Sequence, residues 1–212
     1  MILEVVHYGH PALRQRGMPV GKITPEIEKL IADMIETMQA QRGVGLAAQQ
    51  VGVPLRLTVL DVRAVTDRPS SLEINGAPVN PNEVMPMVLI NPEVDGAGTA
   101  AEGPEGCLSF PEIFAEISRP ETVAVKALDA RGKPFAFRCG GLLARSVQHE
   151  TDHLNGILFI DRMSRKAKLE VQPELDDLQA ATKAAWSKKK YDGAAFSAGR
   201  RKFPGRILKC SA

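Results

Sequence analysis

VQHETDHLNG, residues 147–156, carries the pattern on which the fold and the chemistry of this chain depend. His149 and His153 are four positions apart, and Glu150 directly follows the first histidine. On an α-helix that spacing places both imidazoles on one face, about one turn apart, where they can bind the same divalent ion. Glu150 would lie beside the ion as a general base. Because catalytic zinc sites usually have three protein ligands and a water, a third ligand must come from elsewhere in the chain.

The composition is that of a globular protein with one sizeable core. The chain has 212 residues, of which 44% are hydrophobic and 25% are charged, values typical of a globular domain. No apolar run approaches the length of a membrane span, and the N-terminal sequence lacks the pattern of a signal peptide. The three cysteines, Cys107, Cys139 and Cys210, therefore favour a reducing compartment, and we expect a cytoplasmic protein without membrane contact.

Positive charge is concentrated at the C-terminus. Residues 183–212 contain nine lysines or arginines and one acidic residue, whereas residues 1–182 contain 18 basic and 24 acidic residues. Such a basic terminus indicates either an acidic partner, such as RNA, or a solvated extension.

Hydrophobic periodicity predicts three helices. The first begins at Thr24-Pro25, an N-cap followed by proline at the first turn, and ends at Gly43. The second carries the two histidines and ends at Asn155-Gly156. The helices are expected at 24–43, 142–154 and 173–186.

Strands are more numerous than helices and do not alternate with them regularly. Pro92 is expected to end the second strand, and residues 63–88 are expected to form a long surface loop. The strands are expected at 55–62, 87–94, 121–129, 134–139 and 157–161. This order predicts an α+β fold with antiparallel or mixed sheets.

The residues alone leave the third ligand open. One metalloprotease pattern places a third histidine at position 159, but the chain has Phe159 there. Another class uses a downstream glutamate, and Glu170 and Glu174 lie at suitable distances. Upstream, Cys107 in EGCLSFPE (105–112) offers a thiolate, a strong ligand for zinc or ferrous iron. A lone cysteine, however, is often only a small buried residue.

A third segment, GVGLAAQQVG at 43–52, indicates a cleft. Its glycines match a dinucleotide-binding fingerprint, but that fingerprint follows a strand and opens a long helix. Here a helix is expected before the segment, and Gly52 and Pro54 interrupt any helix after it. A turn of small residues that carries one amide, Gln50, is better interpreted as a cleft wall.

Together, GVGLAAQQVG, EGCLS and QHETDHLNG resemble the three motifs of the peptide deformylase family, in the same order. The resemblance implies an α+β fold whose sheets pack around a central helix carrying HExxH. It implies hydrolysis of the N-formyl group of N-terminal formylmethionine on newly made polypeptides, with release of formate. It covers about residues 1–165, which we expect to be the catalytic domain. Residues 166–212 are expected to be a C-terminal helix and a basic tail, not an independent domain.

The resemblance also implies the metal site. Cys107 becomes the third ligand beside His149 and His153, which leaves a fourth position for water. Cysteine and histidine accept both zinc and iron. The family resemblance favours Fe²⁺, with Zn²⁺ or another divalent ion as a substitute.

Three further residues receive catalytic roles from the resemblance. Glu150 takes a proton from water and passes it to the leaving amine. The side-chain amide of Gln50 and the backbone N–H of Leu108 stabilise the charge that develops on the carbonyl oxygen.

The substrate is expected to bind as an extra strand and to place its methionine side chain against the central helix. Three helix residues share the face of His149, and Arg145 among them is expected to reach the rim of the pocket. Asp152 is expected either to accept a hydrogen bond from an imidazole or to be exposed. The expected substrate contacts are Val44, Gly45, Gly106, Leu142, Arg145 and Ser146.

Two other functions remain open at this point. A zinc peptidase would use Glu174 in place of Cys107, and a non-catalytic RNA-binding protein would use the metal only for structure. The basic tail is expected to dock on ribosomal RNA. The sequence does not specify an oligomeric state.

Overall fold

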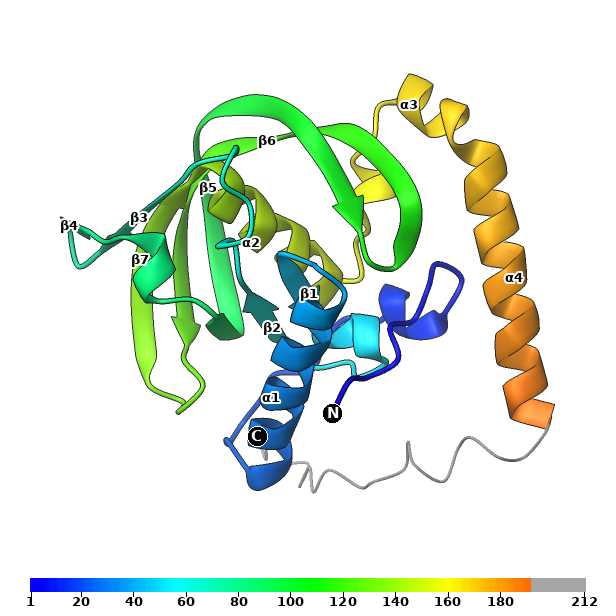
Figure 1. Cartoon of the computed structure of the whole chain (residues 1–212), viewed down its shortest axis with the longest axis horizontal. Coiled ribbons are helices and arrows are strands. Elements are labelled where there is room, and N and C mark those ends of the chain that lie inside the picture. Colours follow the sequence, from blue (N-terminus) through cyan, green and yellow to red (C-terminus); the bar gives the residue numbers. More distant parts are fainter. Residues whose placement is uncertain (192–212) are drawn as a thin grey trace, which may run out of the picture.

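The structure is a computed structural model that describes residues 1–191, with side chains to residue 187. One antiparallel sheet runs in the order β1-β2-β5-β6-β7-β3-β4 (Figure 1). Its strands are Gly45–Ala47 (β1), Leu57–Leu60 (β2), Ser70–Ile74 (β3), Ala77–Pro78 (β4), Met87–Cys107 (β5), Phe110–Leu128 (β6) and Pro134–Gly140 (β7). The helices are Pro25–Ala40 (α1), Gly141–Leu154 (α2), Arg165–Glu170 (α3) and Gln172–Tyr191 (α4). Short 3₁₀ turns lie at Pro11–Arg14, Ala48–Val51, Pro81–Glu83 and Phe159–Asp161.

Helix α2 lies at the centre of the molecule, between the curved sheet and the N-terminal elements (Figure 1). Its first amides are satisfied at the start of β3: Leu142 N–H donates to the Pro69 carbonyl at 3.3 Å, and Leu143 N–H donates to Ser70 Oγ at 3.0 Å. A side chain at Gly141 would meet the Pro69 oxygen at 2.1 Å, and Gly141 has a φ of +65°, so only glycine fits. These contacts confirm the predicted α+β fold around a central helix.

Strand β5 is much longer than the sequence predicted, because the chain continues through Pro92. Asn91 has a φ of 52°, and the register with β6 shifts between Ile90 and Glu93, so the proline occupies a bulge. The amide of Asn91 holds this bulge by donating to Val20 O at 2.8 Å and accepting from Val20 N at 2.9 Å. The expectation that Pro92 ends the strand was therefore wrong.

Two other expectations were wrong. Residues 63–88 are not a loop throughout, since they contain β3, β4 and a 3₁₀ turn, and the β3–β4 hairpin adds to the sheet beside β7. Residues 157–161 do not form a strand: Phe159–Asp161 is a 3₁₀ turn whose Phe159 and Ile160 are buried. The apolar side chains of this segment pack into the core from a helical turn and not from a strand.

Helix α1 begins at Pro25 as predicted, although the Thr24 side chain makes no capping hydrogen bond. Helix α4 packs on the core through Leu175, which is 1% exposed, and Trp186 meets the ring of His10 at 4.2 Å. None of the helices in the described part of the chain is long and apolar enough to cross a bilayer. The predicted basic tail after Tyr191 lies outside the described residues.

Candidate metal centre

Cys107, His149 and His153 come together at the centre of the molecule. Each offers one ligand atom, and these atoms lie within 4.8 Å of one another. Cys107 Sγ is 3.3 Å from His153 Nε2. Both histidines are buried and the cysteine is half-buried. One thiolate and two imidazoles form a donor set that fits Zn²⁺ or Fe²⁺, so these residues fit the expected metal.

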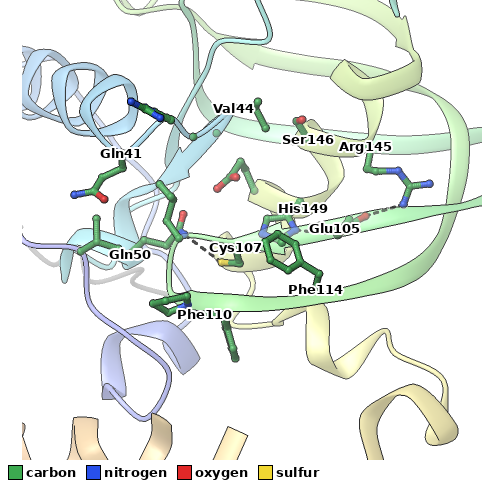
Figure 2. A pocket seen from close by; sticks show the side chains of 18 of the residues that line it. Gln41, Val44, Gln50, Glu105, Cys107, Phe110, Phe114, Arg145, Ser146 and His149 are labelled. Atoms are coloured by element: carbon green, nitrogen blue, oxygen red, sulfur yellow. Dashed lines mark hydrogen bonds and ion pairs between the residues drawn. The ribbon is translucent and has the colours of Figure 1, made fainter. Parts of the chain in front are cut away.

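The elements that carry the ligands explain this geometry. Cys107 is the last residue of β5, and the tight connection to β6 holds it against α2 (Figure 2). The two imidazoles lie one helical turn apart, with ring centroids at 5.0 Å. Phe159 stands where one metalloprotease pattern has its third histidine, and it is buried against His149.

Glu105 orients His149. Its carboxylate lies 3.0 Å from His149 Nδ1 and receives hydrogen bonds from Arg119 at 2.6 and 3.0 Å and from Arg145 at 2.8 Å. Burial alone would raise the pKa of Glu105, but the hydrogen bonds from His149 and Arg119 lower it to about 2. The carboxylate is therefore an acceptor, so Nδ1 donates and Nε2 remains free to bind a metal.

Sequence reasoning missed Glu105 and assigned a related role to Asp152. Asp152 is 6% exposed and pairs with Arg119 at 2.8 Å and Arg162 at 2.6 Å, so it neither contacts an imidazole nor lies in solvent. A signal for Glu105 was present: it stands two residues before Cys107 in a strand, and residues two apart point to the same side.

Arg145 also differs from the expectation. Its side chain is only 12% exposed, and besides Glu105 it donates to the carbonyls of Ala101 at 2.9 Å and Ile117 at 2.7 Å. It lines the cleft, as predicted, with its side chain largely buried. Its donors instead tie α2 to the β5–β6 hairpin, because a planar guanidinium can serve several acceptors at once.

Glu150 is buried beside the ligands. Burial raises its pKa to about 7, and Oε2 has no hydrogen-bond partner among the described residues. Its Oε1 would lie 2.4 Å from a side chain placed on Gly45, so only glycine there leaves room for the carboxylate. A buried carboxyl group with a pKa near neutrality and a free oxygen is suited to proton transfer.

Gln50 directs its amide nitrogen into the same space. Its Oε1 accepts a hydrogen bond from the Ala47 N–H at 2.8 Å, which orients Nε2 towards Cys107 Sγ and Ser109 Oγ, both at 3.4 Å (Figure 2). Leu108 lies in the connection between β5 and β6, directly after the cysteine.

These residues surround one cleft of about 660 Å³. The structure places all six predicted substrate contacts on its wall, with Gln50, Cys107, Leu108, His149 and Glu150. The wall also contains residues that the sequence did not single out, notably Phe114 (Figure 2).

Comparisons with known proteins agree with this site. The family model for polypeptide deformylase matches residues 2–169. The chain belongs to the polypeptide deformylase family. It is 41% identical to the peptide deformylase of Opitutus terrae, covering 87% of this chain and 97% of that protein. It is 44% identical to the peptide deformylase of Methylacidiphilum infernorum, covering 84% and 94%.

Solved structures give the same relationship. A peptide deformylase from Legionella pneumophila aligns with a TM-score of 0.71 at 36% identity, over 85% of this chain and 97% of that one. A second, from Synechococcus elongatus in complex with actinonin, aligns with a TM-score of 0.69 at 37% identity, over 83% and 85%. The deformylase family consists of metal-dependent hydrolases that remove the N-formyl group from the formylmethionine of new polypeptides.

The other candidate for the third metal ligand lies away from this site. Glu174 is exposed in the first turn of α4 and is not part of the metal-ligand group. The two remaining histidines are apart from that group: His7 is exposed on the cleft wall, and His10 Nδ1 accepts a hydrogen bond from the Ala12 N–H at 3.2 Å.

Proposed function

We propose that Cys107, His149 and His153 hold the catalytic metal and that Glu150 is the general acid and base of deformylation. The observation that supports this is the position of one buried carboxyl group, with an unpartnered oxygen, beside three converging ligand atoms. A bound divalent ion would polarise the formyl carbonyl and activate the attacking water. We propose Fe²⁺ as the ion in the cell, with Zn²⁺ able to replace it.

Glu150 moves the proton. With a pKa near 7, its carboxylate can take the proton of the attacking water and its acid form can return that proton to the leaving amine. Its neighbour Gly45 has no side chain and so leaves space for the Glu150 carboxyl group beside the water and the leaving amine.

Gln50 and Leu108 stabilise the negative charge that forms on the formyl oxygen. The amide of Gln50 is already oriented by Ala47, so little reorganisation is needed when charge develops. Removal of one such donor typically raises the barrier by about 3 kcal/mol.

The peptide lies extended between β1 and the end of β5. Among the described residues, strand β1 pairs only with β2, which leaves its other edge open there for a peptide to bind by strand addition. Val44, Gly45 and Gly106 all line the cleft that would receive such a peptide. The methionine side chain then points towards α2 and contacts Leu142 and Ser146, while Arg145 holds that wall in place.

The decisive experiment combines formate release with metal analysis. Protein purified without oxygen should release formate from a formyl-Met peptide and contain about one divalent ion per chain. Failure of the loaded protein to release formate would refute the proposal, as would an equal rate for Glu150→Gln.

Three wider assignments accompany this function. We infer that residues 1–165 form the catalytic unit, with the C-terminal helix as an extension of the same core. The basic tail is proposed to dock on ribosomal RNA, where formylated nascent chains appear. We propose accordingly that the protein acts in the cytoplasm.

A further inference from the structure

Phe114 is an exposed aromatic side chain on the wall of the catalytic cleft. Five large apolar side chains are exposed in the described part of the chain, and Phe114, at 67%, is the one of these that lines the cleft. The other four are Met1, Ile2, Met18 and Leu169. An exposed aromatic group at a cleft mouth has no folding partner on its open face and is available to a ligand.

Gly106 allows the ring of Phe114 to reach the cleft. The two residues are partners in the β5–β6 register. A side chain on Gly106 would meet Cδ1 and Cε1 of Phe114 at 2.7 and 2.6 Å, so the ring covers the position that such a side chain would occupy. With glycine there, the ring can lie across β5. Figure 2 shows the ring among the side chains that line the cleft.

The alternation of side chains along β5 decides which part of a substrate meets this ring. Glu105 and Cys107 face α2, because they contact its two histidines. Gly106 lies between them and faces the opposite side of the strand, and Phe114 shares that side as its partner. In an extended peptide, successive side chains likewise point to opposite sides. If the first side chain points towards α2, the second points to the face that carries Phe114.

We propose that Phe114 is a specificity-determining residue that contacts the side chain of the second residue of the formyl-Met substrate and favours a large apolar one there. This inference rests on the proposed function and on the extended peptide described above. The exposed face of the Phe114 ring supplies the contact, and the metal ion takes no part in it. An aromatic pair of this kind contributes about 0.5–1.5 kcal/mol, which corresponds to roughly 2–12-fold in relative kcat/KM.

The test compares formyl-Met-Phe-Ser with formyl-Met-Ala-Ser. Wild-type protein should hydrolyse the phenylalanine peptide with a kcat/KM about 2–12-fold higher. Phe114→Ala should bring the ratio of the two kcat/KM values close to one, whereas Phe114→Leu should keep part of the preference. Leu169→Ala, which removes an exposed apolar side chain from α3 outside the cleft, is the matched control and should leave the ratio unchanged.

The outcomes separate this inference from the activity itself. Absence of formate release from either peptide by wild-type protein would overturn the proposed function. Normal release with the same ratio in wild-type and Phe114→Ala protein would overturn only the role of Phe114. An equal loss for both peptides in the variant would also overturn it, because a purely structural role predicts that result. If Phe114→Ala does not fold, Phe114→Leu should lower the ratio in part and Phe114→Tyr, which keeps the ring, should retain it. Equal ratios in these two variants would overturn the role of Phe114.

Discussion

The carboxylate of Glu105 and the imidazole of His149 are joined by a hydrogen bond of 3.0 Å, and this contact links the metal ligand to the β5–β6 hairpin. The same carboxylate binds Arg119 and Arg145, and both arginines also contact other parts of the fold. The orientation of His149 is thus set by groups from one hairpin and one helix. Ligand geometry and hairpin packing should therefore change together when either is perturbed.

Replacement of Glu105 by glutamine should weaken metal binding. The variant keeps the shape of the side chain but loses the charge that holds the His149 proton and compensates two arginines. Loss of such an outer partner typically lowers metal affinity about 10–100-fold. Competition with a chromogenic chelator measures this, and Glu102→Gln, on an exposed position of the same strand, is the control. Equal affinities for the two variants would contradict the role of Glu105.

Replacement of Arg145 by alanine should mainly reduce stability. The guanidinium binds Glu105 and carbonyl groups on both strands of the hairpin. Its removal takes one charged donor from Glu105, which keeps Arg119, and takes the side-chain donor from these carbonyl groups. Because Arg119 still compensates the charge of Glu105, the expected cost is that of a lost hydrogen bond to a charged group, about 1.5–3 kcal/mol. Urea denaturation should show a loss of this order, against little change for the exposed Arg138→Ala. A raised KM with an unchanged unfolding free energy would instead identify Arg145 as a direct substrate contact.

Cys107 and Glu174 can be compared directly as third ligands. Cys107→Ser replaces a thiolate by a poor ligand for zinc or iron, so metal affinity should fall by more than the ~10–100-fold typical of outer partners. Glu174→Ala should leave metal content unchanged, since that residue is exposed on α4. The metal content of each variant after dialysis distinguishes the two candidate ligands. The reverse pattern would support a peptidase-type site.

Cys139 should be inert in the folded protein. It is 3% exposed in the core, and burial raises its pKa to about 12. Because the thiolate is the reactive form, at pH 8 only roughly one molecule in ten thousand would carry it. Mass spectrometry after iodoacetamide treatment should find Cys139 modified in denaturant but not in the native state. Equal modification in both states would show that the strand opens readily.

The sequence predicts the parts of the fold whose signals are local. Helix α2 and the β6–β7 hairpin follow from periodicity and turn residues, and both are present. The passage of β5 through Pro92 could not be predicted, because it depends on Asn91 binding Val20, which lies far away in the chain. Strand β3, with the sequence SSLEI, has too few apolar residues to be recognised before its pairing with β7 is known.

The candidate site likewise contains residues that the local sequence predicts and residues that depend on the tertiary structure. His149, His153 and Glu150 lie in one short motif that the local sequence identifies, whereas Cys107 was assigned only through the family resemblance. The structure brings the three ligand atoms together. The contacts of Arg145 and Asp152 with other side chains depend on which strands pass α2, so helical spacing alone did not predict them. Phe114 became visible only through its register with Gly106.

Deletion of residues 187–212 tests the docking of the basic tail. The deletion removes eight of the nine basic residues counted from Lys183 onward, together with one acidic residue. Electrostatic binding to RNA releases counterions, so the logarithm of the affinity should fall linearly with the logarithm of salt, with a slope of about −0.7 for each phosphate contacted on a single strand. Cosedimentation with ribosomes at several salt concentrations should show a steep slope for the full chain and a shallow one after deletion. Formate release from a short formyl-Met peptide, which does not need the tail, should be unchanged. Equal affinity and equal slope for the two proteins would mean that the tail takes no part in ribosome binding.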